Sequence, residues 1–540
     1  MKIELELLLL LADLYDNVPM VTPNRAELLY ELASDIWQKR LQEENRCKKV
    51  VAIDLHSESD FCTNTNYRLT INDIVRLEQD MPSLRCKMSF YGTLDKILLP
   101  SSYYCCGEKL KIIQHYASML LYTDDGVIKA RSYHSRCKKC KSKYYHGFSE
   151  DCEGKRTFED LKDLDVLIFN SGVAFTKSLM NRFDKLICIG AMTFEKLAEY
   201  YQSLHSVDIN PDRIETSWFF FRILHHVRVF DQWPRKKSKE LDVENVCGLV
   251  FDDIKDNLQK LALQHVCDDI GCKEKFIVID GNEKLFRAIC ATDKEKVDSI
   301  PGAINGYKVC INNPLRGNQH SKVSQFCAQH QHNRTAPVHD PLDIRAVTRS
   351  MTKDIPSSLS TADGCKKVEN VNRFFNRSAG MFYVYRPCGY RMARYEMYTA
   401  ESLSSVYTYL VDLFGDEIVQ NLRGIVYDRA CGLHPFLVRL AREGNKTAEI
   451  YSQLHFIVDI FHAEKHEAEK CNINSEQCMY HPHLDKFQFV NAMNTEVAEQ
   501  SFSKINPFKN TTRKMTYCKR LLYLSFIDEH HNEKFNRSII

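Results

Sequence analysis

Acidic residues stand at four positions that suit the binding of divalent metal ions. Asp280 and Asp428 each end a short apolar run with the length and composition of a buried strand. Glu496 and Glu499 lie three residues apart, and so on one face, at the capped start of an expected helix. An isolated Asp280, followed by Gly-Asn, would more simply begin a turn. The repetition instead favours carboxylates from three elements that hold a pair of Mg²⁺ or Mn²⁺ ions about 4 Å apart for phosphoryl transfer.

The elements expected around these acids follow one another as strand, long insert, two strands, helix, strand and helix. The strands fall at 276–281, 381–387, 390–398 and 424–428, and the first helix at 401–414. This is the element order of a ribonuclease-H-like fold, with acids on the first strand, the fourth strand and a later helix. The predicted fold class is therefore α/β, with a ribonuclease-H-like catalytic core that carries a zinc-binding insertion and follows an α+β zinc-ribbon-like region.

Composition predicts three domains. Residues 1–99 form a mixed, mainly helical region, residues 100–245 a zinc-ribbon-like DNA-binding domain with a cysteine cluster, and residues 246–540 the catalytic core. The core carries its cysteine-rich zinc insertion at about 285–335. In the second domain, apolar runs predict strands at 166–169 and 186–189, and longer periodic stretches predict helices at 194–205 and 217–229.

The charge and hydropathy of the chain argue against a strongly basic protein and against a membrane protein. Its 540 residues include 73 Lys and Arg against 71 Asp and Glu, for a net charge of +2, so any nucleic-acid-binding surface must be local. No apolar run approaches the ~20 residues that span a bilayer. The leucine-rich start contains Glu4 and Glu6 and no small-residue cleavage site, which favours an amphipathic helix over a signal peptide.

The chain has 21 cysteines, many for a protein without a secretion signal, and this richness indicates metal ligands. Cys106, Cys137 and Cys140 have the character of a zinc ribbon, with Cys105 or a histidine as fourth ligand. Cations interleave with aromatic residues around them, which suits contacts to DNA phosphates and bases as well as a solvated charged face. The cations are Arg136, Lys138, Lys139 and Lys141, and the linker cations Arg235, Lys236 and Lys237 offer a further backbone contact or only a hinge.

A second group of cysteines surrounds the strand of Asp280. The preferred zinc site there is of the Cys₃His type and consists of Cys290, Cys310, Cys327 and His330. Two further cysteines, Cys267 and Cys272, join this site or form a second one. Such a site would supply folding free energy to a long insertion with little core of its own.

Two features flank the expected acid-bearing helix. His462 and His466 lie four residues apart, so they share a helix face and suit either a metal or a structural role beside Asp459. After Glu499 a run of cations and aromatics offers a track for substrate DNA. Its cations are Lys504, Lys509, Arg513, Lys514, Lys519 and Arg520.

Five short segments gather these acids, histidines and cysteines in order. They are Val278-Ile279-Asp280-Gly281-Asn282, Arg386-Pro387-Cys388-Gly389, Val426-Tyr427-Asp428-Arg429-Ala430-Cys431, Asp459-Ile460-Phe461-His462 with His466, and Asn494-Thr495-Glu496-Val497-Ala498-Glu499-Gln500. In this order they resemble the Kyakuja-Dileera-Zisupton group of eukaryotic DDE transposases. The amino-terminal cysteines resemble the cysteine-cluster domains that accompany this group. The resemblance covers about residues 100–530.

The resemblance implies a ribonuclease-H-like core that cuts and rejoins DNA with Mg²⁺, in which Asp280 and Asp428 are the two strand acids. The Glu-Gln pair of the group falls on Glu499 and Gln500, so Glu499 is the preferred third acid and Glu496 the alternative. A protein of this kind would bind transposon ends and target DNA through its zinc modules, and we expect a homo-oligomer in the nucleus.

Two other functions fit the same residues. The first is a domesticated, catalytically inactive, zinc-dependent protein that binds DNA or chromatin. The second is a ribonuclease-H-like nuclease without strand transfer. Divalent-metal-dependent nicking of DNA separates the enzyme from the first, and joining of a pre-cut end to target DNA separates it from the second.

Overall fold

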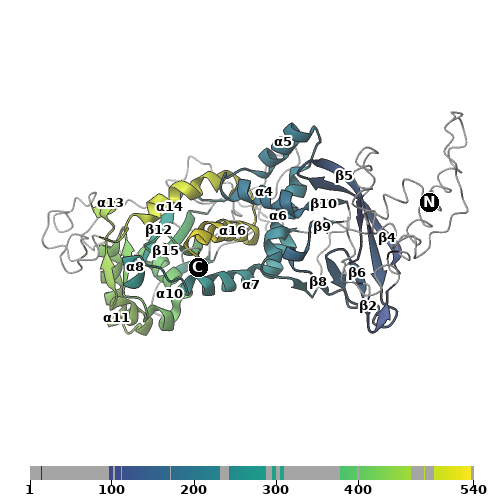
Figure 1. Cartoon of the computed structure of the whole chain (residues 1–540). Helices are drawn as coiled ribbons and strands as arrows, with labels where there is room; N and C mark the ends of the chain where they lie inside the picture. Colours follow the sequence, from purple (N-terminus) through teal and green to yellow (C-terminus); the bar gives the residue numbers. More distant parts are fainter. Residues whose placement is uncertain are drawn as a thin grey trace, which may run out of the picture. The chain divides into compact units, whose positions relative to one another are not determined.

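The structure is a computed structural model that describes most of residues 96–287, 378–463 and 492–536. Its gaps within these ranges are residues 101, 103, 111, 171, 232–242 and 398–400, and beyond them it describes residues 14, 29, 295–298, 305–308 and 480. The predicted region 1–99 and insertion 285–335 thus lie almost wholly outside the described residues. The chain divides into two compact units, Met1–Val246 and Cys247–Ile540. Figure 1 shows the elements of both.

The first unit is built on a nine-stranded sheet, counted over the described residues. Two long strands, β4 (Ile112–Thr123) and β5 (Gly126–Arg136), form an antiparallel hairpin. The spatial order is β11-β8-β7-β6-β5-β4-β10-β9, and β1 also pairs with β5. The other strands are β1 (Lys96–Leu98), β6 (Lys143–Tyr145), β7 (Phe148–Glu150), β8 (Arg156–Phe158), β9 (Val166–Asn170), β10 (Val173–Thr176) and β11 (Val229–Phe230).

Three helices accompany this sheet: α4 (Lys177–Cys188), α5 (Phe194–His205) and α6 (Pro211–Leu224). The predicted helix at 194–205 is confirmed, but the strand predicted at 186–189 is wrong. Those residues end α4, because its apolar side chains recur every three to four positions and not in alternation. The buried ones are Leu179, Met180, Phe183 and Ile187.

The second unit contains a five-stranded sheet with the order β16-β15-β12-β17-β18. Its strands are β12 (Phe276–Asn282), β15 (Gly380–Tyr385), β16 (Arg391–Met397), β17 (Gly424–Tyr427) and β18 (His455–Ile457). β12 is central: it pairs antiparallel with β15 and parallel with β17. β15 and β16 form the predicted hairpin. The carboxyl ends of β12 and β17 therefore lie next to each other at one edge of the sheet.

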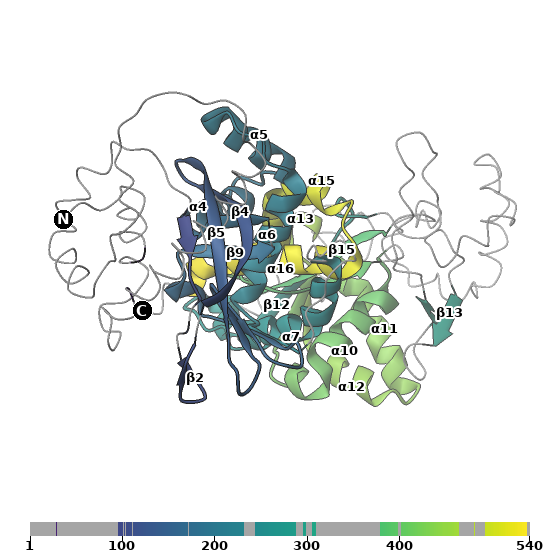
Figure 2. The ribbon, with the colours of Figure 1, turned by 90° about the vertical axis from the view of Figure 1, so that its right-hand side faces the viewer.

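Helices cover both faces of this sheet. Alternate residues of β12, such as Ile277 and Ile279, share one apolar core with α10 (Leu403–Val419), α11 (Ala430–Arg442) and α12 (Lys446–Ser452). The other face meets α14 (Val497–Ile505) and α16 (Tyr517–Asn536). Figure 2 shows α10, α11 and α12 gathered together. Since strand residues alternate between faces, Asp280 lies on the α14 face and Gly281 on the α10 face.

Shorter elements complete the described chain. They are β2 (Tyr104–Cys105), β3 (Glu108–Lys109), α7 (Val243–Leu263), α8 (Ile270–Lys273), β13 (Glu295–Asp298), β14 (Asn305–Lys308), α13 (Ile460–Ala463) and α15 (Lys509–Thr512), with single 3₁₀ turns at Leu161–Asp163 and Asn506–Phe508. No helix in the described part of the chain combines the length and apolar character needed to cross a bilayer.

Candidate active site and metal centres

The register of the sheet brings the two strand acids together. Ile279 of β12 pairs with Tyr427 of the parallel strand β17. The next residue on each strand is an acid, so Asp280 and Asp428 stand side by side at the carboxyl ends of adjacent strands. Asp428 is 9% exposed, and Asp280 is partly exposed. The predicted pair thus arises directly from strand pairing.

Asp280 lies in a strongly negative environment. Burial raises the pKa of its carboxyl group well above the usual range, and the negative charges of Glu401, Asp428 and Glu499 raise it further. The backbone N–H of Gly281 opposes this shift by donating to Asp280 Oδ1 at 2.7 Å. Carboxylates from four elements therefore act on one another here, which is unfavourable unless protons or cations compensate their charge.

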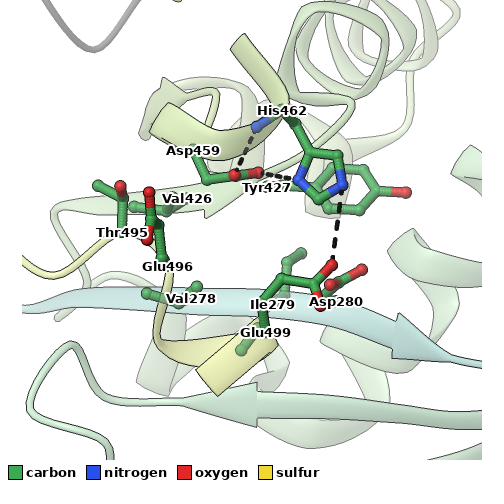
Figure 3. A pocket seen from close by; sticks show the side chains of 11 residues that line it. Val278, Ile279, Asp280, Val426, Tyr427, Asp459, His462, Thr495, Glu496 and Glu499 are labelled. Atoms are coloured by element: carbon green, nitrogen blue, oxygen red, sulfur yellow. Dashed lines mark hydrogen bonds and ion pairs between the residues drawn. The ribbon is translucent and has the colours of Figure 1, made fainter. Parts of the chain in front are cut away.

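The two acids of α14, Glu496 and Glu499, lie in the same pocket as Asp280. Glu496 stands at the amino-terminal cap of α14, where its N–H donates to Asn494 Oδ1 at 3.2 Å, and Glu499 lies in the first turn. Both line a pocket with Asp280 (Figure 3). The charge of Glu499 acts on Asp280. The pocket also includes Val278, Ile279, Val426, Tyr427, Asp459, His462, Thr495 and Ala498.

A histidine held by an aspartate faces this pocket. His462 Nδ1 lies 2.8 Å from Asp459 Oδ2, and the backbone N–H of His462 donates to Asp459 Oδ1 at 2.9 Å. Because a carboxylate only accepts, Nδ1 carries the proton and Nε2 is left facing the pocket. Nε2 is 4.0 Å from Glu499 Oε1. Thr495 joins the two segments by accepting the Ile460 N–H at 3.3 Å, so the structure favours the predicted link between His462 and Asp459.

Glu401 is a fifth acid, which the sequence analysis missed. It directly precedes Ser402, the cap of α10, and its carboxylate packs against Gly281, where any Cβ would collide with it. Its charge raises the pKa of Asp280 and also adds to the rise that burial causes in the pKa of Tyr427. The only signal in the sequence is an acid at the start of the helix after the third strand, which is common at helix starts and so carries little information.

The donor set of this site fits hard divalent cations. Its acids supply oxygen ligands from separate rigid elements, as Mg²⁺ and Mn²⁺ prefer. Burial and the neighbouring carboxylates together raise the pKa of Asp280, and a bound cation would oppose this rise. The residues that could hold such ions are Asp280, Asp428, Glu499, Glu496 and Glu401.

A cysteine cluster lies in the first unit. One Sγ atom each from Cys105, Cys106, Cys137 and Cys140 lies within 4.8 Å of the other three, so this group could hold a metal ion such as zinc. Cys105 Sγ is 3.4 Å from Cys140 Sγ and 3.6 Å from Cys106 Sγ. These separations approach the edge of about 3.8 Å between sulfurs in a tetrahedral zinc site. Of the alternatives left open, the structure thus places Cys105, and not a histidine, with the predicted three.

The backbone around these cysteines forms two tight turns. Cys106 (φ 52°) and Gly107 (φ 76°) join β2 to β3 with the two positive φ angles of a hairpin turn. After β5, the Cys137 N–H donates to Ser142 O at 2.9 Å. Hydrogen bonds with Ser142 lower the pKa of Cys140 to about 6, whereas the neighbouring sulfurs raise the pKa of Cys106, so the thiols of this cluster do not ionise equally on their own.

For Cys267 and Cys272 the structure favours the second of the two alternatives left open, a site of their own. They lie with His265 and Cys388, and the ligand atoms of all four are within 4.8 Å of one another. The preferred site of Cys290, Cys310, Cys327 and His330 lies outside the described residues, as does His466, and both remain predictions.

The cations predicted to bind DNA have varied surroundings. Those beside the cysteine cluster, Arg136, Lys138, Lys139 and Lys141, are exposed, and Lys139 pairs with Glu108 at 3.3 Å. Of those after Glu499, Lys504 and Lys514 are exposed and Lys509 partly so. Arg513 stacks on Phe286 at 4.3 Å. Arg520 is fully buried and pairs with Glu396, so its prediction as a DNA contact is wrong. Arg235, Lys236 and Lys237 lie outside the described residues.

Comparison with protein families gives two matches. Residues 274–532 match the Kyakuja-Dileera-Zisupton transposase. Residues 100–205 match the CxC5-like cysteine cluster associated with these transposases. The first range contains the acidic pocket, and the second contains the cysteines of the first unit. No curated protein and no solved structure matches the chain.

Proposed function

Because the chain belongs to the Kyakuja-Dileera-Zisupton transposase family, we propose that it is a DDE-type transposase that cuts and rejoins DNA by two-metal-ion phosphoryl transfer. The observation that carries this proposal is the convergence of three acids in the second unit. Asp280 and Glu499 line one pocket, and Asp428 stands beside Asp280 at the end of the adjacent parallel strand. In this proposal the five-stranded sheet and its helices are a ribonuclease-H-like core.

Asp280 and Asp428 are suited to hold the metal ions because rigid, paired strands fix their positions. Glu499 is the preferred third acid, since its charge acts on Asp280, and Glu496 is its neighbour at the cap of the same helix. Bound Mg²⁺ or Mn²⁺ would activate the attacking oxygen and neutralise charge on the leaving one.

His462 has a supporting role in this scheme. With Nδ1 held by Asp459, its Nε2 points toward Glu499 and can orient that carboxylate or accept a proton from an attacking water or 3′-hydroxyl. Of the two roles left open for His462, this proposal takes the positioning role; a metal shared with His466 remains a prediction, because His466 lies outside the described residues.

The first unit is proposed to bind the transposon ends. A zinc ion at Cys105, Cys106, Cys137 and Cys140 would fix the two turns that carry them. The exposed cations Arg136, Lys138 and Lys141 adjoin this cluster and can contact phosphates. A transposase must hold two DNA ends and act on chromosomal DNA, so we propose a homo-oligomer that works in the nucleus.

The deciding experiment is divalent-metal-dependent nicking of supercoiled plasmid by the full chain. Wild type is compared with Asp280→Asn, Asp428→Asn, Glu499→Gln and Glu496→Gln. We expect nicking by wild type with Mg²⁺ or Mn²⁺, and none by the first three variants. Loss of activity in Glu496→Gln but not in Glu499→Gln would identify Glu496, and not Glu499, as the third acid.

A second assay supplies a pre-cut 3′ end and target plasmid. Joined product supports the transposase, whereas nicking without joining identifies a nuclease. A third outcome is that wild type and variants bind DNA equally well and none of them nicks it. This outcome rejects the proposed enzyme activity and favours the inactive DNA- or chromatin-binding protein.

A further inference from the structure

Three cysteines and a histidine converge beside the strand of Asp280. His265 and Cys267 follow α7, Cys272 lies in α8, and Cys388 lies in the turn after β15. The ligand atoms of all four are within 4.8 Å of one another, and Cys388 Sγ is 3.4 Å from His265 Nε2. Three separate segments of the second unit therefore contribute to one cluster.

These separations match tetrahedral coordination. With Zn–S of about 2.3 Å and Zn–N of about 2.0 Å, a tetrahedron places sulfur and nitrogen about 3.5 Å apart. The observed 3.4 Å between Cys388 Sγ and His265 Nε2 is close to this value. The three cysteines are free thiols, so no disulfide accounts for their approach.

A buried cation supplies an independent observation. Arg386 is 9% exposed, and in the described part of the chain its Nε meets no hydrogen-bond acceptor. Its charge lies within electrostatic range of Cys272, Cys388 and Cys267. Beside three neutral thiols the charge of this mostly buried guanidinium would find no counter-charge in the cluster, which is costly. Beside Zn²⁺ bound to three thiolates and a neutral histidine, a centre with net charge −1, it would be compensated.

Backbone hydrogen bonds fix the positions of Cys272 and Cys388. Asp269 caps α8 by accepting the N–H groups of Gly271 and Cys272 at 2.9 and 3.2 Å, which fixes the position of Cys272. The turn that carries Cys388 is closed by two backbone hydrogen bonds between Arg386 and residues 389 and 390. Gly389 adopts φ +99°, a conformation that glycine allows without strain.

We propose that His265, Cys267, Cys272 and Cys388 bind one structural Zn²⁺ in the second unit. This site is complete without the cysteines of the 285–335 insertion and separate from the cluster of the first unit. The zinc ion would connect the segment before β12 to the turn after β15. Gly271, the neighbour of Cys272, packs against Met493 and Pro387 so closely that an added Cβ would lie 2.7 Å from each. Since Met493 lies just before Glu496 and α14, the zinc also supports the helix that bears the third acid.

Metal content of the purified full chain tests the proposal. We expect Cys272→Ser, Cys388→Ser and His265→Ala each to lose one zinc per chain relative to wild type. His265→Cys should retain it, because four cysteines also bind zinc. Cys518→Ser, in α16, is the control and should keep the wild-type content. Equal zinc in wild type and in soluble Cys272→Ser and Cys388→Ser overturns the site.

A measurement on unmodified protein covers the case in which the variants do not fold. Wild type is treated with N-ethylmaleimide, with and without a zinc chelator, and labelling of each cysteine is read by mass spectrometry. We expect Cys267, Cys272 and Cys388 to resist labelling together and to react together once the metal is removed. The same extent of labelling with and without the chelator overturns the proposal. Neither test depends on DNA cutting, so the zinc site and the transposase activity succeed or fail separately.

Discussion

The carboxylate of Glu401 lies directly against Gly281, the residue that follows Asp280. This contact joins the start of α10 to the end of the acid-bearing strand. Position 281 must therefore lack a side chain for Glu401 to reach the other acids.

Gly281→Ala should displace Glu401, because the new Cβ would occupy the place of its carboxylate. We expect a loss of about 1–3 kcal/mol in the free energy of unfolding, as in other overpacked sites, and slower nicking. Urea unfolding measures the first effect. The double variant Gly281→Ala with Glu401→Ala should recover most of the stability. If the two substitutions are instead additive, the contact does not couple these residues.

Divalent cations should stabilise the second unit. At ten times the dissociation constant, Mg²⁺ adds about 1.4 kcal/mol, which corresponds to a rise of a few degrees in Tm. Asp280→Asn and Asp428→Asn each remove one ligand, so this rise should shrink or vanish in both. Thermal unfolding with and without MgCl₂ measures it, and CaCl₂ and NaCl at matched ionic strength serve as controls. An equal rise in wild type and both variants would mean that the metal binds elsewhere.

Removal of His462 should slow nicking while leaving DNA binding intact. His462 touches Asp459 at 2.8 Å and approaches Glu499 at 4.0 Å, so His462→Ala frees the Glu499 carboxylate. Comparable supporting residues of metal sites alter activity by about 10–100-fold. Asp459→Asn should have a similar effect, and the double variant should be little worse than either. Plasmid nicking and fluorescence anisotropy measure the two properties; weaker DNA binding would point to a general loss of structure.

In the buried ion cluster of Arg287, Glu396 and Arg520, loss of the carboxylate should lower the stability more than loss of one arginine. Arg287 Nε donates to both oxygens of Glu396, at 2.8 and 3.0 Å, and Arg520 donates to Glu396 and to Leu285 O. Glu396→Gln leaves two buried cations without their carboxylate, and we expect a loss of about 3–5 kcal/mol. Arg520→Met retains the neutral Arg287–Glu396 pair and should cost less. Chemical unfolding compares them, and the reverse order would show that the charge balance is not what stabilises the cluster.

His531 should make the second unit sensitive to acid. Burial lowers the pKa of His531 to about 3, and the charges of Arg391 and Lys534 contribute. The unfolded chain binds a proton near pH 6.5, but the folded chain does not do so until about pH 3. The stability from this group is therefore fully present above pH 6.5 and is lost as the pH falls toward 3, by at most about 1.4 kcal/mol per pH unit. His531→Gln should flatten this part of the curve of unfolding free energy against pH; an unchanged curve would assign the acid sensitivity to other groups.

The parts of the fold that sequence predicts best are those set by local patterns. The apolar runs before Asp280 and Asp428 form the expected strands, and 381–387 with 390–398 form the expected hairpin. Strand pairing then brings the two acids together without further information. The strand prediction at 186–189 was wrong because four consecutive apolar residues suit a strand as well as the buried end of a helix. Only the spacing of the preceding apolar residues distinguishes the two.

The remaining errors concern partners distant in sequence. Arg520 follows exposed cations in the sequence, and only the folded unit shows that it is buried against Glu396. The pairing of His265 with Cys388 across more than a hundred residues has no spacing signature, although the nearby Cys267 and Cys272 were recognised. Glu401 was missed for the same reason, since its significance depends on Gly281.

The central place of β12 also sets the order in which the second unit can assemble during synthesis. Both strands that pair with β12 come later in the chain, β15 first and then β17, and α14, which packs on it, comes later still. The strand therefore leaves the ribosome with its apolar edge unpaired and needs protection until distant segments appear. A nascent chain interrupted before α14 has the strand acids but neither Glu496 nor Glu499, so synthesis itself keeps incomplete chains without an assembled acidic pocket.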